Sequence, residues 1–426
     1  MKQYLWPMSM ALILSCNTAA AAVNDEVIAE LRATIAALSQ RVAELEQSSN
    51  AATQAAAQSR QTAEQASQQV AQVAAQVEAV NTANAAPSWV DRISLKGDFR
   101  YRYQNDDDQS ADSERNRQRI RARPVLIAQL PNNVEVGFGL ATGSDSPVSS
   151  NQTLGGGGSS KGIYMDLAYF DWQASSTSHV IAGKFENKLV RAGDHSMLWD
   201  GDWRPEGAQL TFDNGSFFGT ALGTWLESDS NSNQEFGYGL QAGARGALGR
   251  IGLSGGVGYY SVDAAGVNCY YKTGECFGNS VTSGGTYRYD FAITEIFAEA
   301  KTDITDLPVS LFVDYANNGD AGQFDTGISA GLTLGKAKKT GSWEVGYVYQ
   351  DLEADAVLGL LTDSDFAGGG SDSKGHILKA AYALNDKIRT KLTYSMAKRQ
   401  DSNGIENGGV PYDFDTLFLE MEFKYD

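Results

Sequence analysis

Histidine and cysteine are the residue types that this chain has least of. Its three histidines, His179, His195 and His376, lie in no recognisable catalytic motif. A nucleophile or a general acid needs a base beside it, and the residues adjacent to His195 cannot form a direct side-chain relay with it. We therefore expect no enzyme, and the sequence indicates neither a metal site nor a cofactor.

Long apolar segments, positive charge and proline are also scarce. Beyond the N-terminal leader, no apolar run reaches the roughly eighteen residues that a membrane-spanning helix needs. With 34 Lys and Arg against 52 Asp and Glu, the formal net charge is −18, which argues against a nucleic-acid partner because phosphate binding needs a basic field. The 8 Pro stand against 45 Gly, 19 Tyr and 17 Phe, a composition typical of strands and turns.

The first residues predict export from the cytoplasm. Lys2 precedes an apolar run that ends near Leu14, and small residues at 19–21 provide a cleavage site of the small-x-small type. The sequence therefore predicts a signal peptide over residues 1–22. Cys16 follows a loose lipoprotein-box pattern but lies inside this leader, and whether it carries a lipid stays open.

The two remaining cysteines predict a disulfide. Cys269 and Cys276 lie in a polar segment flanked by Gly, and an exported chain meets an oxidising compartment. No His lies near them in the sequence, which argues against a metal site. We expect a local disulfide that staples a loop.

Residues 92–130 show the clearest alternation of apolar and charged side chains. Because successive side chains of a strand point to opposite faces, each arm of this stretch has an apolar face and a largely cationic one. Leu95, Phe99 and Tyr101 lie on the apolar face of the first arm. The same division returns near the end of the chain. The cationic set is Lys96, Arg100, Arg102, Arg119, Arg121, Arg123, Lys387, Arg389 and Lys391.

Two kinds of sheet fit such faces. In a soluble sheet the apolar face meets a core, whereas in an outer-membrane barrel it meets lipid and the cationic face lines a water-filled lumen. The connections favour the barrel, because short ones such as 214–215 and 385–386 alternate with long polar ones such as 187–205 and 353–374. We predict an all-β transmembrane protein, a sixteen-stranded antiparallel outer-membrane β-barrel over residues 90–426. Its expected strands are 92–104, 118–130, 134–142, 163–174, 178–186, 206–213, 216–226, 236–247, 250–261, 288–301, 307–316, 324–335, 342–352, 375–384, 387–399 and 412–425.

A heptad pattern precedes the barrel. Apolar residues from Ile28 to Leu45 are spaced alternately by three and four, and the frame continues through small residues to Val80. Such a seam must meet another helix, so we predict an α-helical coiled coil over residues 24–86, the alternative being a disordered linker rich in Ala and Gln. Both barrel ends are expected on the side of the short turns, which is periplasmic in such barrels, so the coiled coil would lie in the periplasm.

Four motifs of the mature chain are typical of one family. They are FRYR at 99–102, YFDW at 169–172, GKFEN at 183–187 and LWDGDWRPEGA at 198–208. On these residues the chain resembles the coiled-coil-bearing putative porin family of Gram-negative outer membranes, whose nearest functional relatives are general and dicarboxylate-type porins. The resemblance implies a sixteen-stranded, trimeric channel that passes small hydrophilic solutes with little or mild selectivity.

The loop over 187–205 is the one that we expect to fold into the lumen and narrow it. Trp199 and Trp203 would be poorly placed in water, so they anchor the loop either inside the barrel or beneath a neighbouring subunit. Acids of this loop would oppose the cationic wall and create a transverse field, and a basic wall selects for anions. The expected constriction residues are Lys188, Arg191, Asp194, Asp200, Asp202 and Arg204.

Other interpretations stay open. The arginines could be paired with lumenal acids such as Asp98, Glu420 and Glu422, and merely fill a wet interior. The coiled coil could tether the barrel to peptidoglycan or a periplasmic partner, with the pore incidental. Acids at 106–108 and 363–372 are expected in solvated outer loops, where they could bridge lipopolysaccharide. Outer-membrane lipid and further copies of the chain, in a homotrimer, are the other expected partners.

Overall fold

The chain consists of two compact units, and the boundary between them falls before Trp89. The predicted signal peptide over 1–22, with Cys16, lies outside the residues that the structure describes. Among the described residues, no helix is both long enough and apolar enough to cross a membrane. This computed structural model describes residues 25–83, 89–228, 234–272, 274–402 and 408–425.

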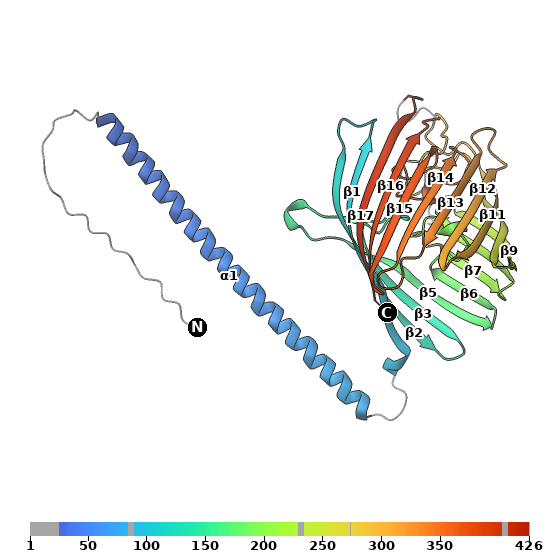
Figure 1. The fold of residues 1–426 in the computed structure, drawn as a ribbon, viewed down its shortest axis with the longest axis horizontal. Helices are drawn as coiled ribbons and strands as arrows, with labels where there is room; N and C mark the ends of the chain where they lie inside the picture. The colour runs from blue at the N-terminus through green and yellow to red at the C-terminus, as the bar shows by residue number, and fades with distance from the viewer. Residues whose placement is uncertain (1–24, 84–88, 229–233, 273, 403–407, 426) are drawn as a thin grey trace. The chain divides into compact units, whose positions relative to one another are not determined.

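The first unit contains one long helix, α1 (Asp25–Ala83), shown in Figure 1. Its sequence is rich in Ala, Gln and Glu and contains neither Gly nor Pro, a composition of high helix propensity. A helix here fits the predicted coiled coil over 24–86. A coiled coil also needs a second helix, however, so that part stays a prediction. Four side chains of the heptad frame are exposed, namely Leu38, Val42, Val70 and Val73.

The second unit is the predicted closed antiparallel barrel of sixteen long strands (Figure 1). Each long strand pairs with the next one along the chain, and β1 closes the barrel by pairing with both β2 and β17. The long strands are β1 (Ile93–Asp108), β2 (Arg115–Leu130), β3 (Val134–Thr142), β5 (Ile163–Ser175), β6 (Ser178–Lys184), β7 (Glu206–Asp213), β8 (Phe217–Glu227), β9 (Glu235–Leu248), β10 (Ile251–Val262), β11 (Phe291–Ile304), β12 (Leu307–Asn318), β13 (Thr326–Gly335), β14 (Trp343–Leu352), β15 (Ser373–Asn385), β16 (Ile388–Arg399) and β17 (Tyr412–Tyr425).

Short elements complete this unit. The two-residue strand β4 (Gln152–Thr153) pairs with the part of β2 that β3 does not reach. The 3-10 helix η1 (Trp89–Arg92) leads into β1. The other 3-10 helices lie in connections between strands: η2 (Gly156–Gly158), η3 (Ala192–Asp194) and η4 (Gly359–Leu361).

The predicted strand ranges 134–142, 206–213 and 412–425 agree with the structure at both ends. A larger difference lies at the loop end of β1 and β2, where backbone pairing continues to Asp106↔Arg115. Both sides of these strand ends carry polar residues, so hydrophobic alternation did not reveal them. The prediction that the acids at 106–108 lie in a solvated loop is therefore wrong for Asp106, which is buried and pairs with Arg117 at 2.6 Å.

The exposure of the side chains follows the predicted alternation. In β1, Arg100 and Arg102 are 5% and 2% exposed, whereas Phe99 and Tyr101 are 36% and 42% exposed. An exposed apolar face that surrounds a polar interior is the pattern of a barrel whose outer band meets hydrocarbon.

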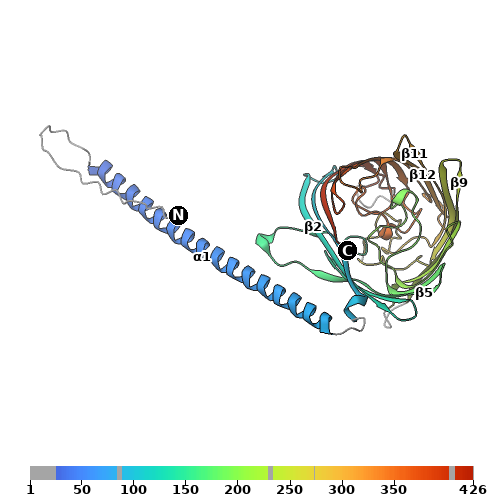
Figure 2. The same ribbon diagram turned by 60° about the horizontal axis from the view of Figure 1, so that its bottom comes forward.

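Three connections fold back into the barrel, and Figure 2 shows coil inside the ring of strands. They are 185–205, 353–372 and the described part of 263–290. Their apolar side chains pack together and against the inner wall in one buried cluster. Members from the three connections and from the wall include Phe185, Met197, Trp199, Trp203, Tyr260, Tyr270, Tyr287, Leu360 and Leu361.

The prediction that 363–372 is a solvated outer loop is wrong. Phe366, Ala367 and Asp372 are 2%, 1% and 3% exposed. The preceding residues, 354–361, are mostly apolar and are also buried, so they hold the whole connection inside the barrel.

Candidate functional site

Four arginines form a block on the inner face of β1 and β2. Arg100 lies directly opposite Arg121 in the strand register, and Arg102 lies opposite Arg119. Like charges directly opposite each other destabilise a strand pair, so this block needs carboxylates nearby.

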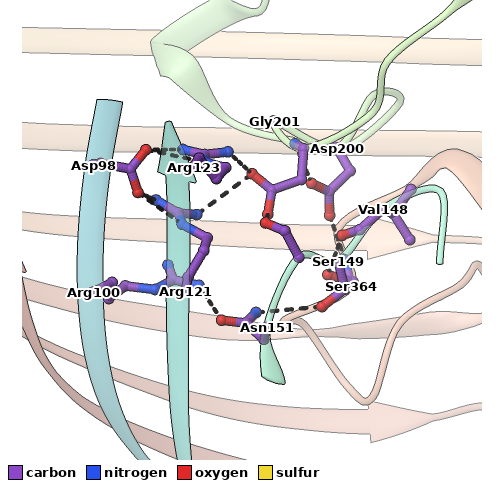
Figure 3. A network of polar contacts seen from close by, with 12 residues as sticks. Asp98, Arg100, Arg121, Arg123, Val148, Ser149, Asn151, Asp200, Gly201 and Ser364 are labelled. Atoms are coloured by element: carbon purple, nitrogen blue, oxygen red, sulfur yellow. Dashed lines mark hydrogen bonds and ion pairs between the residues drawn. The ribbon is translucent and has the colours of Figure 1, made fainter. Parts of the chain in front are cut away.

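Two acids form ion pairs with Arg121 of the block and with Arg123 beside it on β2. Asp98, from β1, pairs with Arg121 at 2.9 Å and with Arg123 at 2.7 Å (Figure 3). Asp202, from the 185–205 connection, pairs with Arg123 at 2.7 Å and with Arg121 at 3.4 Å. The predicted wall and the predicted constriction loop therefore meet in one network of two arginines and two carboxylates.

Acids of β17 and of the 353–372 connection pair with Arg100 and Arg102. Glu420 pairs with Arg100 at 3.0 Å and with Arg102 at 2.7 Å, and all three side chains are buried. Asp365 makes two hydrogen bonds of 2.7 Å with Arg102. Fork-to-fork contacts of this kind fix geometry as well as charge.

The cationic residues of β16 pair with acids of β17. Arg389 pairs with Glu422 at 2.6 Å, and Lys391 with Glu420 and Glu422 at 3.3 and 3.2 Å. Lys387 lies in the exposed turn between β15 and β16 rather than on a strand, so the structure does not place it in the wall. Lys96 is on β1 and is exposed.

Arg119 has neutral partners. Its Nη1 donates to the Gln104 side chain at 3.0 Å, and its Nη2 donates to the Asn151 carbonyl at 3.1 Å. Asn151 also accepts a hydrogen bond from Arg100 through its side-chain oxygen. In the part of the chain that the structure describes, Arg119 forms no ion pair.

The six predicted constriction residues divide into two groups. Asp200, Asp202 and Arg204 are buried or partly buried near the arginine block, and Arg204 contacts Asp166 at 3.3 Å. The other three stay apart from it: Arg191 donates to Ser196 within the connection, Lys188 pairs with Glu186, and Asp194 is exposed.

Aromatic stacking holds the 185–205 connection in place. The rings of Trp199 and Trp203 stack with centroids 5.0 Å apart, and Trp199 meets Tyr260 of β10 edge-on at 4.8 Å. Both tryptophans are buried within a single chain. A neighbouring subunit is therefore not needed to cover them.

Hydrogen bonds join this connection to 353–372. Asp200 N–H donates to the Leu361 carbonyl at 2.7 Å, and Ser364 N–H donates to the Asp200 carboxylate at 2.8 Å. Asp363 N–H donates to the Ser196 carbonyl at 3.1 Å. The two connections thus form one inner partition, which we call the double loop, over residues 185–205 and 353–372.

Asp200 and Asp202 have opposite electrostatic environments. Burial opposes ionisation of Asp202, but Arg123, Arg121 and Arg204 outweigh it and hold the pKa of Asp202 well below its usual range. Burial raises the pKa of Asp200, and the charges of Asp202 and Asp363 raise it further. Asp202 is therefore the acid that faces the wall as an anion.

The double loop and the loop over 143–151 border two cavities. The larger, of about 780 Å³, is lined by Arg115, Arg117 and Arg119 on one side and by residues 368–370 on another. The smaller, of about 430 Å³, is lined by Asp202, Arg204 and neighbouring residues.

Sequence reasoning missed Asp365, Gln104 and Asn151. Their contacts depend on connections that fold inward, which strand alternation does not report. One signal was present, because six of the eight residues over 354–361 are Ala, Val or Leu, which is unusual for a loop in water.

The 263–290 connection contains the disulfide that the sequence predicts. Cys269 and Cys276 are joined by a disulfide, with Cα atoms 5.0 Å apart, inside the 263–290 connection. Among the residues with described positions, no group of three or more His, Cys, Asp and Glu side chains could hold a metal ion.

Comparison with known proteins gives a family and a fold. A family model described as "Putative porin" matches residues 107–263 and 287–425, which is most of the barrel. No curated protein matches the chain.

Three solved structures have a similar barrel. OprB of Pseudomonas putida has a TM-score of 0.53 at 11% identity, over 79% of this chain and 95% of its own. A loop-deletion mutant of OmpT, an outer membrane protein of Vibrio cholerae, has a TM-score of 0.45 at 13% identity, over 78% and 99%. A triple mutant of Rhodopseudomonas blastica porin has a TM-score of 0.46 at 11% identity, over 78% and 100%. At these identities the OprB likeness concerns the fold alone.

Proposed function

Since this chain belongs to the Putative porin family and is an outer-membrane channel, we propose that it is a water-filled diffusion channel for small hydrophilic solutes with a preference for anions. The block of four arginines on the inner face of β1 and β2 carries this proposal. Rings or ladders of Arg favour anions in pores.

The placement of the acids supports a selective wall over a merely wet interior. Asp202 and Asp365 come from the double loop, whereas Arg102, Arg121 and Arg123 come from the barrel wall. Positive charge on the wall and negative charge on the facing loop create a transverse field, which orients dipolar solutes. Most of the arginines are nevertheless neutralised by these contacts, so the expected preference is moderate and depends most on Arg119.

Reversal potentials in planar bilayers across a KCl gradient test the proposal. The wild-type chain is expected to prefer chloride, and Arg119→Ala is expected to lower this preference because it removes a charge whose hydrogen-bond partners in the described structure are neutral. Arg121→Ala leaves Asp98 and Asp202 with only Arg123, so it is expected to lower the preference as well. Cation preference in the wild type would overturn the proposal, and unchanged selectivity in both variants would remove the arginine block from it.

The same fold leads us to propose that the chain catalyses no reaction. The family and the barrel are those of a channel. The buried His195, which pairs with Gln350 at 2.7 Å, lies inside the double loop and serves to position it in this proposal.

The helix α1 supports two further proposals about partners. Its exposed apolar frame suits a coiled coil with copies of this chain, which would make a homotrimer held by helices and barrel walls. Gly97 of β1 pairs with Tyr425 of β17, so both ends of the barrel lie together, on the side of the short turns. That side faces the periplasm in such barrels. The second candidate function is therefore a periplasmic tether to peptidoglycan or a protein partner, with lipopolysaccharide contacting the opposite rim.

A further inference from the structure

Arg119 differs from its neighbours in the arginine block because no carboxylate of the described residues forms an ion pair with it. Arg100 and Arg102 share Glu420, and Arg121 shares Asp98 and Asp202 with Arg123. The guanidinium group of Arg119 has five N–H groups, of which two have acceptors in the described structure, and both acceptors are neutral. Arg119 also lies directly opposite Arg102 in the strand register, so its charge is locally in excess.

Buried polar atoms without partners gather around the same place. The Nε atoms of Arg117 and Arg119 and the hydroxyl oxygen of Thr416 are buried, with no hydrogen-bond partner in the described structure. All three residues line the cavity of about 780 Å³, and Thr416 is only 2% exposed. Buried polar groups without partners are costly, so a solute in this cavity that offers an acceptor would gain by bonding to them.

The charges that line the cavity favour Arg119 as the place for an anion. Four cationic and four acidic residues line it in total. Asp106 forms its ion pair with Arg117, and Asp365 forms its ion pair with Arg102, so neither of these acids is bonded directly to Arg119. One uncompensated guanidinium group matches one carboxylate, which it can bind with two N–H groups at once.

The rest of the cavity wall suits a hydroxylated solute. Ser144, Ser146, Ser149, Thr362 and Ser364 line it, together with backbone at 368–370. Hydroxyl and peptide groups both donate and accept hydrogen bonds, as sugar-like hydroxyls do. The volume is within the usual range of small-molecule sites.

We propose that this cavity is a binding subsite for a small hydroxylated carboxylate of sugar-acid size, with Arg119 as the residue that receives the carboxylate. The neighbouring arginines pair with carboxylates of the protein, whereas Arg119 would pair with the carboxylate of the solute. The proposal rests on the proposed anion preference and names the class of anion that the channel retains longest.

The test uses the full mature chain in planar bilayers at constant KCl, with gluconate or glucose added on one side. Gluconate is expected to reduce the chloride current in a saturable way, and neutral glucose is expected to have no saturable effect. Arg119→Gln is expected to raise the half-inhibiting gluconate concentration by about tenfold or more, the effect of losing one charge-assisted contact. The matched control is Arg245→Gln, because Arg245 pairs with Asp213 outside the cavity and its loss should leave the inhibition unchanged.

The test still decides the proposal if a variant fails to insert. If Arg119→Gln does not insert, Arg119→Lys replaces it, since Lys keeps the charge but loses the planar fork. Gluconate should inhibit this variant at a concentration between those for the wild type and for Arg119→Gln. If no variant inserts, the wild type decides, because equal effects of gluconate and glucose would overturn the subsite. An unchanged half-inhibiting gluconate concentration in Arg119→Gln would also overturn it.

The failure of this inference differs from the failure of the proposed function. A wild-type channel that prefers chloride but shows no saturable inhibition by gluconate keeps its anion preference and loses the subsite. A wild-type channel that prefers potassium in the reversal-potential measurement loses both.

Discussion

At the scale of single residues, the interior depends on which carboxylates face arginine and which do not. Asp202 faces Arg121 and Arg123 and is held ionised, whereas Asp200, two positions earlier, has a raised pKa. Asp363, across the double loop, resembles Asp200: burial raises the pKa of Asp363 to about 6, and the charge of Asp365 adds to this effect. The sequence predicts the same role in the constriction for Asp200 and Asp202, and it predicts a solvated outer loop for Asp363.

Asp363 gives a prediction of pH dependence. Between pH 7.5 and 5 it takes up a proton, which removes a negative charge near Arg102 and should increase the preference for anions. The same proton uptake also stabilises the fold as the pH falls. Because the folded pKa lies above the ordinary value, the stabilisation is complete below the ordinary pKa of Asp and is lost as the pH rises through about 6. Reversal potentials at the two pH values measure the first effect.

Asp363→Asn is expected to abolish most of this pH step. The control Asp303→Asn changes an exposed carboxylate near a short turn and should keep it. A step of undiminished size in Asp363→Asn would assign the titration to another group, with Asp200 as the first to examine.

At the scale of elements, one buried side-chain amide makes three of the hydrogen bonds that hold the 353–372 connection inside the barrel. Asn279 donates to the carbonyls of Ala354 and Val357 at 2.7 and 2.8 Å, and its oxygen accepts from Gly359 N–H at 2.8 Å. Asn279 is 1% exposed. It therefore joins the disulfide-containing connection to the double loop.

Asn279→Ala is expected to loosen the double loop without unfolding the barrel. The change leaves two carbonyls and one N–H group buried without this partner, at a local cost on the order of 2 to 4 kcal/mol. Faster amide hydrogen exchange over 354–371 and more frequent current fluctuations should follow. The control Asn116→Ala removes an exposed side-chain amide and should change neither. Unaltered exchange in Asn279→Ala would contradict the role assigned to this residue.

The sequence predicted the wall better than what the wall encloses. Alternation identified Arg100, Arg102 and Arg121 as inward-facing, because a strand repeats its direction every two residues. The two tryptophans, rather than alternation, indicated that the 187–205 loop needs cover. Neither signal could identify Asp365 or Asn279, because they lie in connections and no periodicity links them to their partners.

At the scale of the whole molecule, the helix and the barrel are separate compact units. Deleting residues 24–86 therefore tests the role of α1 without removing a strand. If α1 assembles copies of the chain, the variant should conduct as single barrels but run as a smaller species in native electrophoresis. An unchanged oligomer with loss of attachment to the cell envelope would instead favour the tether.

The closure of the barrel joins the two ends of its sequence. Arg102 in the first strand bonds Glu420 in the last one, 318 positions away. Until the final fourteen residues of β17 arrive, the first strand keeps an open row of backbone groups that hydrocarbon cannot satisfy. A chain cut short before β17 is therefore expected not to insert into the bilayer, because the edge of its first strand would stay unpaired.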